Sequence, residues 1–82
     1  MQSSILKIAL IYGGRSAEHE VSLRSALSVF DAIDRSRFEP IPVLITQNGA
    51  WYRMASDAGS FSPGATTAEK DRLLFSPDPE HR

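Results

Sequence analysis

The sequence predicts an α/β fold that consists of a βαβ unit followed by a hairpin. Three observations carry this prediction: an apolar run over residues 6–12, a helical period over residues 21–34, and alternating apolar residues over residues 38–45. Strand, helix and strand in this order are typical of a parallel pair of strands joined by a crossover helix.

The first strand is expected over residues 6–12, where Lys7 is the one charged residue. So short and apolar a run suits a strand of a parallel sheet that is covered on both faces. Gly13 and Gly14 follow the run. They are expected to turn the chain sharply off the sheet, because glycine adopts positive φ readily.

The helix is expected over residues 21–34, with one apolar stripe facing the sheet. The residues of that stripe are Leu23, Ala26, Leu27, Phe30 and Ile33. Ser16 or Ser22 is the expected N-cap. Glu18 and Glu20 lie near this end, where negative charge favours the positive end of the helix dipole.

The second strand is expected over residues 38–45, although it contains Pro40 and Pro42. Proline lacks the N–H of a ladder hydrogen bond, so this strand should lie at an edge, or pair on its carbonyl side only over its first half. Asn48-Gly49 then predicts a tight turn into Trp51 and Tyr52, which complete a hairpin.

Residues 55–82 are rich in Ser, Gly, Pro and Thr and are expected to be mostly loop. A short helix is expected at residues 67–72 and a short strand at residues 73–75. A βαβ unit with a hairpin leaves a sheet edge and apolar faces uncovered. Further strands and helices are therefore expected from a longer protein.

Composition excludes several classes of function. The 82 residues include no cysteine, so disulfides and thiolate metal sites are excluded, and His19 and His81 form no zinc pattern. A net charge of −1 gives no indication of nucleic acid as a partner. The apolar runs are far shorter than a membrane span, and no signal peptide is visible. An intracellular protein with no membrane partner is expected.

Residues 13–22 join a strand to a helix, which is where open α/β sheets bind ligands. A nucleotide site is disfavoured here, because G-x-G-x-x-G and G-x-x-x-x-G-K-S/T are both absent. The Glu18 carboxylate suits a ligand ammonium, yet residue type and spacing alone favour a carboxylate that merely complements the helix dipole. His19 is expected to be a solvated neighbour rather than a catalytic base.

The run KIALIYGGRSAEHEVS at residues 7–22 closely resembles the N-terminus of D-alanine-D-alanine ligases. The pattern GG-x-S-x-E-x-x-VS is much more specific than a lone glycine pair. The likeness covers about residues 6–53, including the turn and aromatic residues at positions 48–52. Beyond residue 55 the family is variable and the likeness fades.

The resemblance implies an ATP-grasp ligase that joins two D-alanines through an acyl phosphate, using ATP and Mg²⁺, to make the dipeptide of peptidoglycan. Such an enzyme is expected to be a cytoplasmic homodimer. Residues 1–82 would then be an incomplete doubly wound, Rossmann-like (pre-ATP-grasp) parallel sheet. An ordered βαβ unit plus hairpin at residues 6–54 would precede a variable, loop-rich segment at residues 55–82.

The same resemblance implies roles for individual residues. By its place in the motif, Glu18 corresponds to the family's active-site glutamate, a catalytic residue that helps to hold the ammonium of the first D-alanine. Val21 would face the methyl group of that D-alanine. Ser22, with the Gly13 and Gly14 turn, would form the wall of the pocket.

The family's second motif, H-G-x-x-G-E-D-G, is absent from this sequence, as are the ATP-grasp lysines and the metal-binding carboxylates. No cofactor or metal site is therefore expected within this chain, and it should be inactive without the remaining polypeptide with its central and C-terminal domains. Two alternatives stay open: a stand-alone α/β binding or scaffold domain without catalysis, and a different enzyme with a nucleotide-binding crevice.

Overall fold

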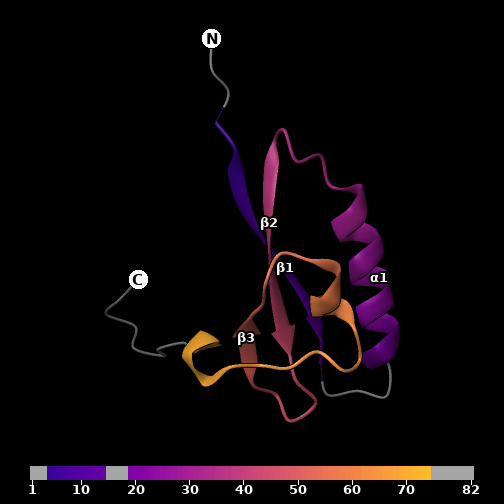
Figure 1. Ribbon diagram of the computed structural model, residues 1–82, viewed down its shortest axis with the longest axis vertical. Helices are drawn as coiled ribbons and strands as arrows, with labels where there is room; N and C mark the ends of the chain where they lie inside the picture. Colours follow the sequence, from indigo (N-terminus) through magenta and orange to yellow (C-terminus); the bar gives the residue numbers. More distant parts are fainter. Residues whose placement is uncertain (1–3, 15–18, 75–82) are drawn as a thin grey trace, which may run out of the picture.

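The computed structural model describes residues 4–14 and 19–74. The elements in chain order are β1 (Leu6–Gly13), α1 (His19–Ala32), β2 (Phe38–Ile45), β3 (Trp51–Arg53), the 3-10 helices η1 (Ala58–Phe61) and η2 (Glu69–Asp71), and β4 (Arg72–Leu73). Within these residues, four strands form one sheet in the order β1-β2-β3-β4 (Figure 1).

The predicted α/β fold is confirmed, and its sheet is mixed. Strands β1 and β2 are parallel over their whole length, whereas β3 is antiparallel to both β2 and β4. The helix starts and ends two residues earlier than predicted. The short helix expected at residues 67–72 is the single 3-10 turn η2, and the strand after it is β4; residue 75 lies outside the described residues.

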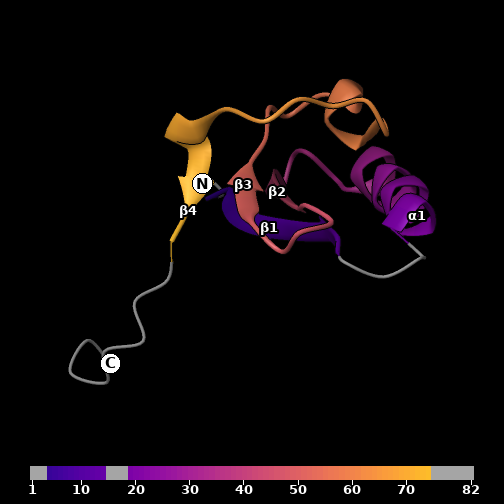
Figure 2. The ribbon, with the colours of Figure 1, turned by 90° about the horizontal axis from the view of Figure 1, so that it is seen from below.

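Helix α1 covers one face of the sheet, with η1 beside it (Figure 2). Alternate residues of β1 point to opposite faces, so Leu10 and Tyr12 pack toward the helix. On the opposite face Ala9 is exposed and Ile11 is 50% exposed. Within the described part of the chain, β1 is therefore covered on one face, as expected if further elements of a longer protein cover the other.

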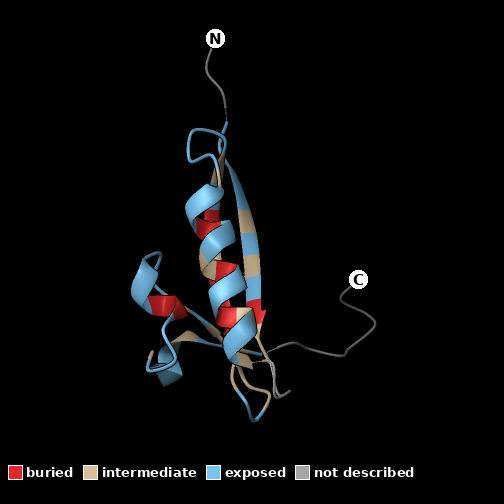
Figure 3. Cartoon of the chain, turned by 90° about the vertical axis from the view of Figure 1, so that its right-hand side faces the viewer, coloured by how far each residue is buried: buried red, intermediate tan, exposed pale blue. Residues whose placement is uncertain are grey.

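The core lies between the sheet and α1, where the buried residues of the helix form one stripe (Figure 3). Its buried members are Tyr12, Leu23, Ala26, Phe30, Leu44 and Phe61. The ring centroid of Phe61 lies 4.6 Å from that of Tyr12 and 5.0 Å from that of Phe30. A residue from the segment expected to be mostly loop therefore joins strand and helix in the core.

Tyr12 is both packed and hydrogen-bonded. Its hydroxyl donates to the main-chain carbonyl of Ser60 at 2.8 Å, which ties η1 to the end of β1. Burial, together with a smaller effect of the nearby Asp57 charge, raises the pKa of Tyr12 to about 12. The neutral phenol is therefore the form that the fold stabilises.

The main-chain nitrogen and carbonyl groups of the two prolines of β2 face away from β1. Strand β2 is internal over Val43, Leu44 and Ile45, which pair with β3 as well as with β1, so the prediction of an edge strand is wrong. Over its first half β2 pairs with β1 alone, as the second alternative required. On the other margin, the carbonyls of Pro40 and Pro42 accept hydrogen bonds from Ser56 Oγ and the Met54 N–H.

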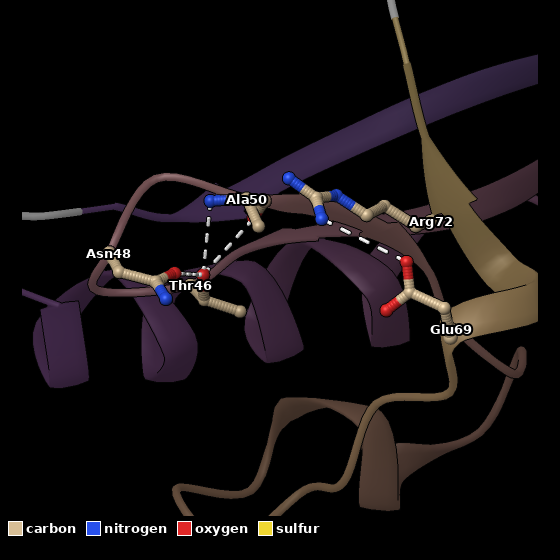
Figure 4. A network of polar contacts seen from close by, with 5 residues as sticks. All are labelled: Thr46, Asn48, Ala50, Glu69 and Arg72. Carbon is tan, nitrogen blue, oxygen red and sulfur yellow. Dashed lines mark hydrogen bonds and ion pairs between the residues drawn. The ribbon is translucent and has the colours of Figure 1, made fainter.

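The predicted turn at Asn48-Gly49 is confirmed and is organised by Thr46 (Figure 4). The Thr46 hydroxyl donates to the Asn48 side-chain carbonyl and accepts the Ala50 N–H at 3.1 Å. Gly49 has φ of +94°, which a glycine adopts without strain. Figure 4 also shows an exposed Arg72–Glu69 ion pair at 3.8 Å, which contributes at most about 1 kcal/mol.

The two glycines after β1 differ in what surrounds them, although both have positive φ, +93° at Gly13 and +115° at Gly14. A Cβ atom on Gly13 would lie 2.4 Å from the Ile45 carbonyl oxygen and 2.9 Å from Leu44 Cδ1. A Cβ atom on Gly14 would meet nothing within 4 Å. Gly13 is therefore required by packing as well as by conformation.

Substituting the two glycines one at a time separates these requirements. Gly14→Ala should lower the free energy of unfolding by about 1–3 kcal/mol through backbone strain alone. Gly13→Ala should lower it further, because the Ile45 main chain must also move. Urea denaturation of both variants checks this, and equal losses would contradict the close approach at Gly13.

Removing the Phe61 ring should destabilise the fold strongly. Phe61→Ala is expected to lower the free energy of unfolding by about 3–5 kcal/mol, because it leaves a cavity between strand and helix. Ala58→Ser, at an exposed position of the same 3-10 turn, is the matched control and should change it by less than about 0.5 kcal/mol. A small effect of Phe61→Ala would mean that η1 does not pack on the core.

Tyr12 should make stability fall at high pH. Its pKa is raised in the folded protein, so its contribution is complete below pH 10 and is lost as the pH rises toward 12. Between these values the unfolded chain has released a proton that the folded chain keeps, so the free energy of unfolding falls by at most about 1.4 kcal/mol per pH unit. Urea denaturation between pH 9 and 12 should show this fall, and Tyr12→Phe should lack it.

Candidate functional site

The candidate site is the turn between β1 and α1, where three hydrogen bonds hold the glycine pair. The Gly14 N–H donates to the Ile45 carbonyl at 2.8 Å. The Gly13 N–H donates to Ser22 Oγ at 2.9 Å, and His19 Nδ1 donates to the Gly14 carbonyl at 2.7 Å. These bonds join the end of β1 to the end of β2 and to the first turn of α1.

The sheet explains why the site lies here. Gly13 and Ile45 are paired residues at the carboxyl ends of the parallel strands β1 and β2. In open α/β sheets the crevice outside these ends is the usual ligand site. The N-terminus of α1 lies beside these carboxyl ends, since the Ser22 side chain is hydrogen-bonded to the Gly13 main chain.

Ser22 supports the turn instead of capping the helix. Because α1 begins at His19, Ser22 lies inside its first turn, and the prediction of Ser22 as N-cap is wrong. Ser16, the other predicted N-cap, lies outside the described residues. The Ser22 hydroxyl oxygen instead accepts the Gly13 N–H, so this side chain connects the first turn of α1 to the end of β1.

Val21 presents an exposed apolar side chain in the same helical turn as Ser22. It lies in the first turn of α1 and is 51% exposed, so its side chain is accessible to a small ligand. Glu20, in the same helical turn, is exposed and places a carboxylate near the positive end of the helix dipole. Glu18, the residue on which the predicted chemistry depends, lies outside the described residues.

His19 is the residue that sequence reasoning missed. It was expected to be a solvated neighbour, but it is partly buried and bound to the Gly14 carbonyl. A carbonyl oxygen only accepts, so Nδ1 must carry the proton. Nothing in the sequence pattern distinguishes this histidine from an exposed one, since the bond depends on how the glycine pair turns.

The described residues contain neither a metal-ligand cluster nor a membrane-spanning helix. Among residues 4–14 and 19–74, no group of three His, Cys, Asp or Glu side chains is arranged to hold a metal ion. Likewise, no helix among them is both long and apolar enough to cross a bilayer.

Comparison with known families gives a match over most of the chain. Residues 7–79 match the family model described as "D-ala D-ala ligase N-terminus". The match extends well past residue 53, where the resemblance seen in the sequence ended. It includes η1 and η2 as well as the glycine turn.

Individual relatives agree with the family model. The chain is 41% identical over 76 residues to D-alanine–D-alanine ligase A of Escherichia coli, covering 93% of this chain and 17% of the relative. It is 47% identical over 64 residues to the ligase A of Mesorhizobium japonicum, covering 77% of this chain and 18% of that relative. The chain thus spans less than a fifth of the length of either protein.

A solved structure agrees in fold. The VanG D-Ala:D-Ser ligase of Enterococcus faecalis superposes with a TM-score of 0.66 at 43% identity, covering 71% of this chain and 17% of that one. The chain therefore belongs to the family of D-Ala-D-Ala ligase N-terminal domains.

Proposed function

We propose that the polypeptide to which this chain belongs is a D-alanine-D-alanine ligase, and that the chain supplies part of the site for the first D-alanine. The observation that carries the proposal is the turn of Gly13 and Gly14, which is hydrogen-bonded to the N-terminal turn of α1. It lies in a chain whose family match spans residues 7–79. Without the remaining polypeptide, the chain would not catalyse ligation.

In this proposal Glu18 is the catalytic residue of the turn. Its carboxylate would pair with the ammonium of the first D-alanine, a charge-assisted hydrogen bond that holds the amino end of the substrate. Its place in the sequence supports this role, because Glu18 directly precedes His19, whose ring is bound to Gly14.

The other predicted residues would define the pocket around the substrate. Val21 is half exposed and would contact the methyl group of D-alanine. Ser22, Gly13 and Gly14 would form the wall. The hydrogen bond from the Gly13 N–H to Ser22 and the tight packing at Gly13 suit this role. A wall held by main-chain bonds keeps its shape before substrate binds, which reduces the entropy cost of binding.

ATP and Mg²⁺ would be held by the remaining polypeptide, because the ATP-grasp lysines and the metal-binding carboxylates of the family are absent from this sequence. The chemistry that ATP would supply when bound there is transfer of its terminal phosphoryl group to the carboxylate of the first D-alanine, with release of ADP. The amine of the second D-alanine would then displace phosphate as the peptide bond forms. Residues 1–82 would be the first part of the ligase's N-terminal domain. The enzyme would act as a homodimer in the cytoplasm, where peptidoglycan precursors are made.

Exchanging Glu18 tests the proposal in the full-length enzyme. Glu18→Gln keeps the size of the side chain and removes its charge. The loss should weaken first-site D-alanine binding by about 1.5–3 kcal/mol, which raises its KM roughly 10- to 150-fold. Steady-state kinetics with D-alanine as the varied substrate measure this.

Glu20→Gln is the matched control, because it removes a carboxylate from the same helix end. It should leave the first-site KM within about twofold, since only a helix-dipole contribution of about 0.3–1 kcal/mol to stability is lost. Equal effects of the two variants would reduce Glu18 to a helix-dipole role. A wild-type enzyme that does not join D-alanines would refute the ligase proposal itself.

A further inference from the structure

We infer that His19 is a positioning residue for the first D-alanine site, acting through its hydrogen bond to the Gly14 carbonyl. The inference rests on the proposed function and adds to it a residue that was expected to be only a solvated neighbour. The described geometry places His19 against both glycines of the turn, by two different kinds of contact.

The first contact is polar. Nδ1 donates to the Gly14 carbonyl at 2.7 Å, within the normal range for such a bond. This bond connects the last described residue before the segment 15–18 to the first residue after it. The histidine side chain therefore links the turn directly to the first residue of α1.

The second contact is steric. The Cε1 atom of His19 lies 3.1 Å from the position that a Cβ atom would occupy on Gly13. The imidazole ring therefore packs into space that exists because Gly13 has no side chain. A flat ring with a donor at Nδ1 fills this space while keeping the bond to Gly14.

His19 and Ser22 are three residues apart on α1, so they lie on the same face of its first turn. They bind complementary main-chain groups of the glycine pair: Ser22 accepts an N–H from Gly13, and His19 donates to the carbonyl of Gly14. Val21 lies between them in the chain. Holding the turn from both sides therefore sets the position of Val21 relative to the pocket wall.

Asparagine and glutamine separate this role from others in the full-length ligase. His19→Asn places an amide N–H near the position of Nδ1, whereas His19→Gln places it near Nε2. His19→Gln should raise the first-site D-alanine KM about 3- to 10-fold, the equivalent of one lost hydrogen bond, with kcat changed less. His19→Asn should remain within about twofold of wild type.

The control is Arg24→Gln, at an exposed position one turn further along α1, which should leave both constants unchanged. Urea denaturation should show similar midpoints for His19→Asn and His19→Gln, so that the KM difference does not reflect unfolding. Equal first-site KM values for the Asn and Gln variants would overturn the inference.

The tautomer provides a test that needs no turnover. In ¹⁵N NMR of the histidine-labelled full-length protein, the resonances that disappear in His19→Asn should show a proton on Nδ1. A neutral ring with its proton on Nε2 would overturn the inference even if the enzyme is active. Failure of the wild type to join D-alanines would instead refute the proposed function and leave this readout intact.

Discussion

The close approach of Gly13 to the Ile45 carbonyl determines the shape of the turn that follows β1. The space there admits no side chain, and the same carbonyl accepts the Gly14 N–H, so the end of β1 is locked against the end of β2. Helix α1 then completes the turn with the Ser22 hydroxyl and the His19 ring. The candidate site is thus built on the sheet itself, and a site on rigid elements holds its geometry more closely than one on a free loop.

The core reinforces this arrangement from directly beneath the turn. Tyr12 immediately precedes Gly13, and its ring packs against Phe61 while its hydroxyl binds the Ser60 carbonyl. Phe61 in turn packs on Phe30 of α1. The 3-10 turn η1 therefore links the strand and the helix whose ends form the site, although it lies about 40 residues further along the chain.

The sequence predicted those features that depend on period, and missed those that depend on tertiary geometry. The apolar run of β1, the stripe of α1 and the alternation of β2 each give a local signal, so these elements were found. Phe61 is one apolar residue in a Ser- and Gly-rich stretch and has no periodic partner, so its place in the core could not be predicted. The hydrogen bond of His19 depends on the path of the glycine pair. Whether β2 lies at an edge of the sheet depends on how far β3 extends along it. The roles of Glu18 and Val21 stay predictions.

The two prolines of β2 have a consequence for self-association. In the parallel pair with β1, the N–H positions of residues 38, 40 and 42 all point away from β1. Phe38 donates its N–H to the Asp34 carbonyl, and the prolines have none to offer. Their carbonyls are engaged by Met54 and Ser56. Over residues 38–42 this margin of the sheet therefore presents no free main-chain donor to a strand from another molecule, which disfavours edge-to-edge pairing there.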